Sequence, residues 1–408
     1  MKRGSRRQFL KTCATAGAAS LLVPNITRSA AAGPGVVVIG AGAFGGWTAL
    51  ELLRRGARVT LLDAWGPGHS RASSGGETRV IRCTYGAQKT YTRMAKRAFE
   101  RWREAERKWN RKVLFPTGAL WMAGRDDAYE KSALPVLKEL GVAFDQLSPA
   151  ECGKRWPQIN FDGITWAIFE RDAGYLLARR SCQWVVETFR AEGGVYRQAR
   201  AAPGAVAAGH MADVALAGGE RIAGEHFVFA CGPWLRTVIP GFEKWIRPTR
   251  QEVFFFGTPA GDARYTDEKL PAWIDNGAKL FYGVPGNQWR GFKLADDARG
   301  AEVDPTSQER RVSDAGVAAA RAYMEMRFPG MRSAPLVESR VCQYENSPDE
   351  NFLLDRLPDA ANAWVLGGGS GHGFKHGPAL GEIAADAVLG RAAAPMEFSL
   401  KRQPGAAA

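Results

Sequence analysis

The sequence lacks the features typical of membrane-embedded, metal-binding and nucleic-acid-binding proteins. After residue 32 no segment has the long uncharged apolar run that a membrane helix needs, so no integral membrane domain is expected. The cysteines form no C-x-x-C pair, and His372 and His376 have no acidic or cysteine neighbours, so no metal site is predicted. No block of basic residues follows the N-terminus, which argues against a nucleic-acid partner.

Acidic residues are absent from the first 32 positions, which hold six basic ones. The run SRRQFLK (5–11) matches the twin-arginine export pattern, and a weak apolar stretch (13–23), Pro24 and three alanines (30–32) follow it. This order predicts a twin-arginine signal peptide over residues 1–32 and a periplasmic or exported protein. A basic, disordered N-terminus is the alternative.

The rest of the chain is also short of cysteine and only moderately charged. Five cysteines remain after residue 32, and their odd number leaves at least one outside any internal disulfide. In the same part 49 basic side chains face 42 acidic ones, and this mild positive field suits an anionic small substrate. With 408 residues, 45% of them hydrophobic, the chain has the composition of a two-domain globular protein, and it indicates no oligomeric state.

A complete βαβ unit follows the predicted signal. Residues 36–39 form a short β-branched run typical of a buried parallel strand, residues 47–55 have helical spacing, and residues 58–62 read as a second strand. The loop between the first strand and the helix has the pattern G-x-G-x-x-G, made by Gly40, Gly42 and Gly45.

Each glycine has a physical role in binding a dinucleotide. Gly40 permits a tight turn, Gly42 removes a side chain where a pyrophosphate approaches, and Gly45 lets the helix pack close to the sheet. The helix N-terminus presents free N–H groups to the pyrophosphate. Asp63 ends the second strand, 23 residues after Gly40, within reach of a ribose hydroxyl. The unit predicts a dinucleotide site without separating NAD from FAD; a glycine turn without nucleotide is the alternative.

Three further segments favour FAD. Residues 64–82 form a long Gly/Ser-rich connection where a simple NAD domain returns quickly to a helix. Residues 364–375 read as a strand and a glycine loop before a helix, which predicts a second cofactor contact with Gly371 and Gly373. Residues 227–234 read as a strand into a glycine turn. Each of the last two alone is also compatible with an ordinary strand–loop–helix corner.

Four stretches carry a resemblance to a known family. They are 36–63, GGETRVIR (75–82), LFYGVPGNQWRGFKL (280–294), and CQYENSPDENFLLD (342–355) continuing to SGHGFKHG (370–377). Over nearly all of residues 34–400 the chain resembles the FAD-dependent amino-acid oxidase (DAO) family, most closely the subgroup of monomeric sarcosine oxidase and N-methyl-tryptophan oxidase.

The resemblance implies roles for nine residues. Cys342 matches the cysteine that carries FAD through a thioether, and Lys293 matches the lysine that promotes reaction with O2. Arg82 and Lys375 match the pair that grips the substrate carboxylate. The remaining matches line the substrate pocket or lie close to the flavin ring: Tyr282, Tyr344 and His372 in the first group, Thr78 and Arg79 in the second.

The chemistry of these residue types agrees with those roles. Arg82 and Lys375 can clamp a carboxylate, and a fixed cation such as Lys293 can stabilise charge that develops on oxygen. Aromatic walls such as Tyr282 and Tyr344 suit an amine. Outside this context, Cys342 reads as an inert buried thiol, Lys293 and Arg82 as surface charges, and His372 as a solvent-facing polar residue.

One position departs from the subgroup. Four residues after Lys293, where the subgroup usually has an active-site histidine, this chain has Asp297. A carboxylate there alters the charge of the pocket and the pKa values of its neighbours. It favours a substrate with an extra cationic group if it faces the pocket, and has no effect on substrate choice if it points away.

The expected fold class is α/β, with a Rossmann-like FAD-binding domain interleaved with a smaller α+β substrate domain that contains a mixed sheet. The predicted boundaries are 33–115, 173–245 and 345–396 for the FAD domain, 116–172 and 246–344 for the substrate domain, and 397–408 for a tail.

The predicted function is FAD-dependent oxidation of the C–N bond of a small secondary amino acid, N-methyl or cyclic, with O2 as acceptor and H2O2 as product. Two alternatives stay open. One is a periplasmic FAD amino-acid dehydrogenase that passes electrons to a respiratory carrier. The other is a flavin-binding partner protein without turnover.

Overall fold

The computed structural model describes residues 33–277 and 280–402. The predicted signal peptide (1–32) and the last six residues of the predicted tail lie outside these ranges. The described residues after Ala32 belong to one compact unit.

A six-stranded sheet carries the βαβ unit, in the order β21-β22-β15-β1-β2-β9. Five of the strands run parallel, and β21 pairs antiparallel at one edge. Buried β-branched residues, Val36–Ile39, fill the central strand β1 because parallel sheets are covered on both faces. The strands are β1 (Gly35–Ile39), β2 (Arg58–Asp63), β9 (Val195–Gln198), β15 (His226–Phe229), β21 (Leu353–Leu357) and β22 (Ala360–Gly367).

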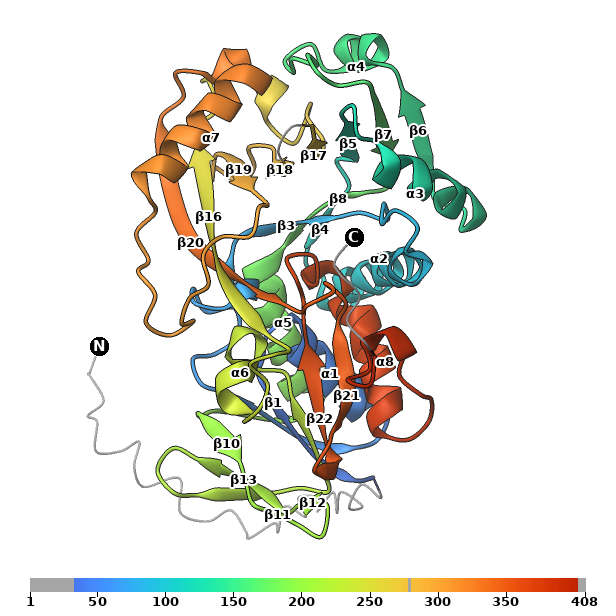
Figure 1. Ribbon diagram of the computed structural model, residues 1–408, viewed down its shortest axis with the longest axis vertical. Helices are drawn as coiled ribbons and strands as arrows, with labels where there is room; N and C mark the ends of the chain where they lie inside the picture. The colour runs from blue at the N-terminus through green and yellow to red at the C-terminus, as the bar shows by residue number, and fades with distance from the viewer. Residues whose placement is uncertain (1–32, 278–279, 403–408) are drawn as a thin grey trace, which may run out of the picture. The chain divides into compact units, whose positions relative to one another are not determined.

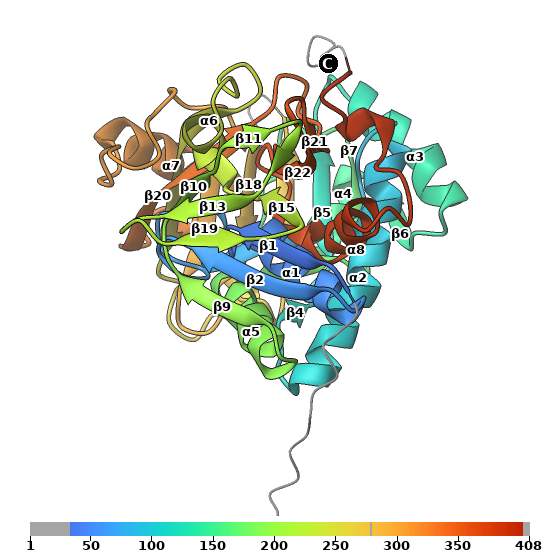
Figure 2. The ribbon, with the colours of Figure 1, turned by 90° about the horizontal axis from the view of Figure 1, so that it is seen from below.

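Alternate residues of β1 pack into different layers, as the two-residue period of a strand requires. Val36 and Val38 belong to the core under the helices, whereas Val37 and Ile39 pack with a small antiparallel sheet. Figure 2 shows the helices on one side of β1, β2 and β9 and the small sheet on the other. The helices are α1 (Ala43–Arg54), α2 (Lys89–Trp109), α5 (Ala178–Ala191) and α8 (Gly377–Val388). The small sheet consists of β10 (Ala201–Pro203), β13 (Asp213–Leu216) and β14 (Arg221–Ala223), beside the hairpin of β11 (Val206–Ala207) and β12 (His210–Met211).

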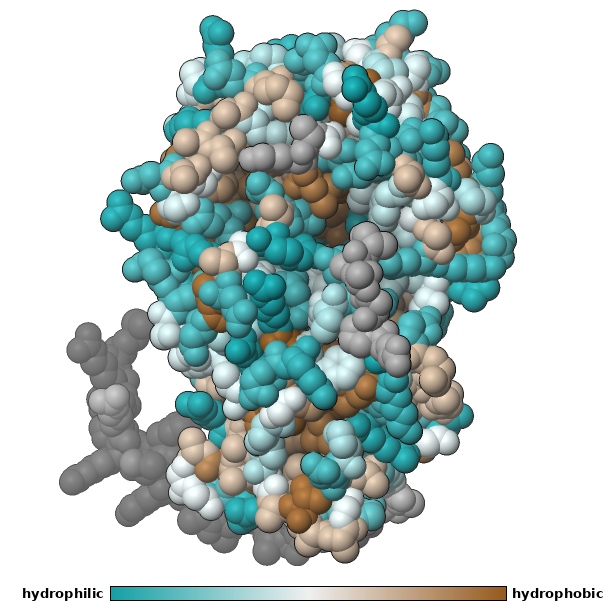
Figure 3. All heavy atoms as spheres, in the orientation of Figure 1, coloured by the Kyte–Doolittle hydropathy of each residue, from teal (hydrophilic) through white to brown (hydrophobic). Residues whose placement is uncertain are grey.

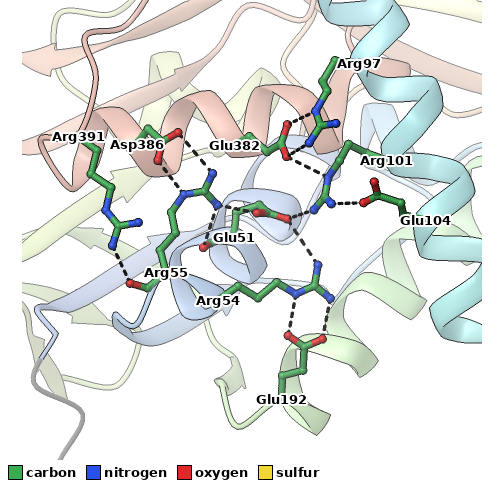
Figure 4. Close-up of polar contacts among 10 residues, drawn as sticks. All are labelled: Glu51, Arg54, Arg55, Arg97, Arg101, Glu104, Glu192, Glu382, Asp386 and Arg391. Atoms are coloured by element: carbon green, nitrogen blue, oxygen red, sulfur yellow. Dashed lines mark hydrogen bonds and ion pairs between the residues drawn. The ribbon is translucent and has the colours of Figure 1, made fainter.

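A charged network ties these helices together on their outer side (Figure 4). Its centre is Glu51 of α1, whose side chain is only 5% exposed. Glu51 pairs with Arg55 at 2.6 Å and with Arg101 of α2 at 2.5 Å. Arg101 also reaches Glu382 of α8, at 3.1 Å. The network therefore joins three helices that are distant in the sequence.

An eight-stranded sheet, drawn in the upper part of Figure 1, has the order β20-β16-β19-β18-β17-β5-β7-β6. It is mixed because β17 and β5 pair in parallel while the other neighbours are antiparallel. Its strands are β5 (Ala119–Ala123), β6 (Phe144–Leu147), β7 (Trp166–Glu170), β16 (Arg247–Phe256), β17 (Ala272–Asn276), β18 (Leu280–Val284), β19 (Phe292–Asp296) and β20 (Leu336–Asn346). Nearby helices are α3 (Ala128–Glu139), α4 (Pro149–Arg155) and α7 (Asp314–Arg327). The mixed sheet and the α/β class agree with the prediction.

A third sheet holds the segment that follows the Gly/Ser-rich connection. It pairs β3 (Thr78–Ile81) and β4 (Leu114–Phe115) with β8 (Gly174–Leu177) between them. The small helix α6 (Leu235–Val238) follows β15. Three short 3-10 helices contribute residues to the site described below: η1 (Ser73–Gly75), η2 (Gly232–Trp234) and η5 (Phe374–His376).

The division into an FAD domain and a substrate domain stays a prediction. The six-stranded sheet draws its strands from 35–63, 195–229 and 353–367, whereas the eight-stranded sheet draws on 119–170 and 247–346. Residues 397–402 of the predicted tail pack onto the structure, since Phe398 is fully buried and Arg402 pairs with Asp349 at 2.8 Å. Among the described helices, none combines the length and apolar character needed to cross a bilayer.

Candidate functional site

A cavity of about 410 Å³ opens at the carboxyl ends of the parallel strands β1, β2, β15 and β22. Gly40 and Gly42 line it, together with Asp63 at the end of β2 and Gly232 after β15. Ligands of doubly wound sheets bind at this edge. The cavity therefore lies where the sequence predicts the dinucleotide.

The glycine loop has the geometry that its pattern predicts. Gly40 has a φ of +110°, and a Cβ on it would lie 2.2 Å from the carbonyl oxygen of Ala230. A Cβ on Gly45 would lie 1.9 Å from the carbonyl oxygen of Gly40, so α1 can approach the strand only without a side chain there. Gly42, by contrast, meets only the Ser74 Oγ at 3.5 Å and faces the cavity.

Asp63 organises the loop with both carboxylate oxygens. Its Oδ2 accepts a hydrogen bond from the Ala41 N–H at 2.7 Å. Its Oδ1 accepts from Trp65 and Gly66 N–H groups at 2.9 and 2.8 Å. The carboxylate lines the cavity while it holds the turn, so contact with a ribose hydroxyl uses its remaining lone pairs.

The other end of the cavity is formed by the C-terminal glycine loop. Gly371, Gly373 and Phe374 line it beside Tyr344. A Cβ on Gly373 would lie 2.7 Å from the Phe44 ring, and one on Gly371 would lie 2.7 Å from the Tyr344 ring. The two predicted glycine contacts thus belong to the same cavity as Gly40 and Gly42, although more than 300 residues separate them.

These residues fit a flavin dinucleotide. The cavity runs from the α1 N-terminus, where the first turn holds no acidic residue, to the C-terminal glycine loop. A buried carboxyl oxygen of Glu345, which lines the cavity, has no hydrogen-bond partner among the described residues. Unpartnered buried polar atoms in such a cavity are typical of a site shaped for a ligand.

Cys342, Arg79 and Lys293 meet in a smaller pocket of about 20 Å³. The Arg79 guanidinium lies 3.8 Å from the Cys342 Sγ, and Arg79 also lines the large cavity. Lys293 is 1% exposed and donates from Nζ to the Thr78 carbonyl at 3.0 Å. Burial, followed by the charge of Arg79, lowers the pKa of Lys293 well below its ordinary value.

Arg82 and Lys375 converge on one aromatic ring. The Arg82 guanidinium lies 4.5 Å from the centre of the Tyr85 ring, and the Lys375 Nζ lies 5.0 Å from it. In the described chain their side chains donate to backbone carbonyls, those of Thr84 and His372, and form no ion pair. Burial, followed by the charge of Arg82, lowers the pKa of Lys375 well below its ordinary value. An anion bound between the two side chains would favour the charged form of Lys375 and raise its pKa again.

Tyr282, Tyr344 and Asp297 form a hydrogen-bonded chain. The Tyr344 hydroxyl donates to Asp297 Oδ1 at 2.6 Å and lies 3.4 Å from the Tyr282 hydroxyl. Burial raises the pKa of Tyr282 to about 12 and also raises that of Asp297. Asp297 therefore faces the tyrosines and does not point away. Its carboxylate joins the predicted pocket residues, with Arg82 and Arg299 as nearby cations.

His372 is packed rather than solvent-facing. Its ring stacks on Phe352 with centroids 5.0 Å apart, and its Nδ1 lies 3.3 Å from the Tyr85 hydroxyl. Burial and the charge of Lys375 lower its pKa well below the ordinary value, which favours the neutral imidazole. His372 thus belongs to the aromatic wall beside Arg82 and Lys375.

The cavity also includes residues that the sequence analysis did not single out. Trp65 and Trp234 lie at one side with ring centroids 4.7 Å apart, and His69 lies beside them. Glu345 lies at the glycine edge. Trp65 and His69 fall within the Gly/Ser-rich connection that favours FAD, and Glu345 within the motif of Cys342, so their segments carried a signal but their roles depend on packing.

Comparisons with known proteins identify the family and match the fold. The sequence model of a family described as "FAD dependent oxidoreductase" matches residues 35–387. The chain is 29% identical to a monomeric sarcosine oxidase from a Bacillus species over 87% of its own length and 92% of the relative's. It is also 29% identical to an N-methyl-L-tryptophan oxidase from Salmonella heidelberg, over 87% and 95% of the two chains. Among solved structures, it matches the fold of an L-proline dehydrogenase from P. horikoshii with a TM-score of 0.77 at 19% identity, over 87% and 93% of the chains.

Proposed function

Because the chain belongs to the FAD-dependent oxidoreductase family, we propose that it oxidises the C–N bond of a secondary amino acid, N-methyl or cyclic, and passes the electrons to O2 with formation of H2O2. The two named relatives, a sarcosine oxidase and an N-methyl-L-tryptophan oxidase, act on substrates of this class according to their names.

One observation carries the proposal. Arg82 and Lys375 lie on the same tyrosine ring and form no ion pair with any described carboxylate, and Phe374, the neighbour of Lys375, lines the cavity that fits FAD. Two adjacent basic groups that form no ion pair make a binding site for an anion, and an amino-acid carboxylate satisfies both. We propose that the amine, which is one carbon away from a carboxylate held there, is received by Tyr282, Tyr344 and Asp297.

The residues of this chain bind and orient the substrate. FAD, when bound, supplies the hydride acceptor for the C–N bond and the redox link to O2. Gly40, Gly42 and the α1 N-terminus would hold its pyrophosphate, while Gly371 and Gly373 leave room at the other end. Arg82 and Lys375 fix the carboxylate, and Lys293 places a buried cation where negative charge can develop on oxygen.

The experiment that tests the function is anaerobic. Sarcosine, N-methyl-tryptophan, pipecolate, proline and common primary amino acids are added separately to the purified protein, and the visible flavin band is recorded. We expect secondary amino acids to bleach the band and O2 to restore it with one H2O2 per substrate. Bleaching that only an artificial electron acceptor reverses would indicate a dehydrogenase, and no bleaching by any of them would contradict the proposal.

We also propose that FAD is attached through Cys342. The Cys342 Sγ lies between the Arg79 guanidinium and the Ser73 carbonyl at 3.8 and 3.9 Å, in the small pocket next to Lys293. After acid denaturation, flavin should remain with the parent protein and leave the Cys342→Ser variant. Cys231→Ser, which changes a thiol in the wall of the large cavity, is the matched control and should retain flavin.

Export through the twin-arginine pathway completes the proposal, on the basis of the sequence at residues 5–11. This pathway, as generally understood, moves folded proteins, which suits a protein that acquires its cofactor before export. Changing Arg6 and Arg7 together to lysine should leave the protein in the cytoplasmic fraction, and unchanged export of that variant would contradict the proposal.

A further inference from the structure

Glu345 is a buried carboxyl group at the edge of the large cavity. It is the second-last residue of β20, is 9% exposed, and lines the cavity. Its Oε1 accepts a hydrogen bond from the Gly369 N–H at 3.2 Å. Its Oε2 is buried and has no hydrogen-bond partner among the described residues. An interior carboxyl oxygen in this state is unfavourable unless a ligand satisfies it.

The unpartnered oxygen faces the glycine edge of the parallel sheet. A Cβ on Gly232 would lie 3.4 Å from Oε2, and one on Gly367 would lie 3.6 Å from it. Gly232 follows β15, and Gly367 ends β22. The same edge carries Gly40 and Gly42, which line the same cavity. Glu345 therefore points toward the edge of the sheet where a dinucleotide would bind.

No described cation pairs directly with the Glu345 carboxyl group. Within the described chain it forms no ion pair, and its side chain has one hydrogen-bond donor, the Gly369 N–H. Burial raises its pKa to about 8, with that hydrogen bond opposing the shift. The titratable groups that share the cavity with it are Cys231 before η2, Tyr344 on its own strand, and Asp63, His69, Arg79, Arg200 and Asp304 on the cavity wall.

A neutral carboxylic acid fits this position better than a carboxylate. Asp63 and a bound diphosphate both carry negative charge, so a further negative charge on Glu345 would be repelled. A protonated carboxyl group can instead donate a hydrogen bond to an oxygen of the ligand. Burial, followed by the charges of Asp63 and Glu345, raises the pKa of the Cys231 thiol, so this neighbour also stays neutral.

We propose that Glu345 is a cofactor-binding residue that acts as a neutral carboxylic acid and donates its O–H to an oxygen of the bound dinucleotide. Oε1 keeps the Gly369 hydrogen bond, and Oε2 carries the proton toward the cavity. The inference rests on the FAD dependence of the proposed function and is independent of the identity of the amine substrate. FAD binding should therefore depend on pH, because ionisation of Glu345 removes its hydrogen-bond donor and adds repulsion between its carboxylate and the negatively charged dinucleotide.

The test measures FAD affinity directly. The Cys342→Ser protein allows flavin to be removed and restored whether or not the parent holds it covalently, and flavin fluorescence reports the dissociation constant. Below about pH 8 this constant should be flat, and above it should rise about tenfold per pH unit as the protonated form is depleted. A constant that stays flat up to about pH 9.5 overturns the proposal.

Two variants separate the neutral acid from a merely structural role. E345Q keeps the shape and a donor but cannot ionise, so its FAD affinity should stay within about threefold of the reference at neutral pH and lose the rise at high pH. E345A removes the donor and should bind FAD about tenfold more weakly at neutral pH. A rise at high pH that persists in E345Q belongs to another group and also overturns the proposal.

Two controls keep the outcome clear. Circular dichroism of the flavin-free proteins checks that each variant is folded. If a Glu345 variant does not fold, the pH profile of the Cys342→Ser reference still tests the proposal. No amine is present in this titration. A pH-dependent FAD affinity without oxidation of any secondary amino acid would support the role of Glu345 and refute the proposed function. Oxidation of a secondary amino acid with a pH-independent FAD affinity would support the proposed function and refute the role of Glu345.

Discussion

Lys293 shows how tertiary packing changes the chemistry of a single residue. The side chain is fully enclosed, donates to the Thr78 carbonyl, and lies 5.1 Å from the centre of the Tyr282 ring. In the sequence it is one of 55 basic residues. Only its burial beside Arg79 and Cys342 distinguishes it from a surface lysine.

Replacement of Lys293 by methionine should separate the two half-reactions. The variant should reduce its flavin with substrate at nearly the parent rate, whereas reoxidation by O2 should be about 100- to 1000-fold slower, because a preorganised cation no longer meets the charge developing on oxygen. Stopped-flow absorbance measures both rates. Equal reoxidation rates in the two proteins would dismiss the role of Lys293.

The pH dependence of reoxidation follows from the lowered pKa of Lys293. The cation is the effective form, so the O2 rate should be highest at low pH and fall as pH rises through the folded-state pKa. Because burial and Arg79 lower that pKa, the fall should begin at a lower pH than an ordinary lysine would show. The Lys293→Met variant should lack this pH-dependent step.

Asp297 should decide which substrates are preferred. Asp297→Asn removes the negative charge while the amide oxygen can still accept from Tyr344, so kcat/KM for an N-methyl amino acid with a cationic side chain should fall about tenfold relative to sarcosine. Asp296→Asn is the matched control, since Asp296 accepts instead from the Ala298 N–H. An unchanged ratio for Asp297→Asn would show that this carboxylate does not contact the substrate.

At the scale of elements, the glycine loops shape the cavity, whereas the charged helix network stabilises the packing of the helices. The loops at Gly40–Gly45 and Gly369–Gly373 remove side chains where two backbones or a ligand approach. The network in Figure 4 instead holds α1, α2 and α8 against one another, and it lies apart from the cavity residues. Changes in the network should therefore alter stability more than cofactor binding.

Glu51→Gln tests this separation. The carboxylate is 5% exposed and serves Arg55 and Arg101, whose side chains are 17% and 13% exposed. Loss of its charge should lower the free energy of unfolding by about 1–3 kcal/mol, less than for a fully dry pair because the arginines reach solvent. Urea denaturation measures it. Glu104→Gln, at the exposed end of the same network, should change stability by less than about 0.5 kcal/mol, and equal losses in both variants would contradict the role of burial.

At the scale of the whole molecule, the cavity gathers segments from most of the described chain. Its walls include Gly40 and Asp63 near the start, Trp234 and Thr306 in the middle, and Phe374 near the end. On the face drawn in Figure 3, polar and apolar residues are interspersed. The inward-facing cavity, rather than this outer face, therefore carries the argument for function.

Bound FAD should stabilise the molecule as a unit. A ligand that binds only the folded protein adds about 2.7 kcal/mol at a hundredfold excess over its dissociation constant, which for a chain of this size corresponds to a Tm increase of about 3 °C. Calorimetry of the Cys342→Ser protein with and without FAD measures the shift. A Tm that does not respond to saturating FAD would contradict the assignment of the cavity.

Local sequence was sufficient for the parts of this protein that depend on near neighbours. The strand–glycine–helix unit at 36–63 has a pattern that few other structures satisfy, because each glycine answers a steric need within a few residues. The buried residues of α2 (Lys89–Trp109) likewise recur with a helical period, which burial on one face imposes.

Contacts between distant residues could be decided only by the tertiary structure. The sequence placed Asp297 at a position of interest but left its direction open, and the hydrogen bond from Tyr344 resolves it. Glu345 lies in the motif of Cys342, but the sequence did not indicate its own role, because a glutamate in a strand is ordinary until its oxygen is found unpartnered beside Gly232. Direction, burial and the resulting pKa depend on what packs around a side chain, and those neighbours come from other segments of the chain, 47 residues away for Tyr344 and Asp297.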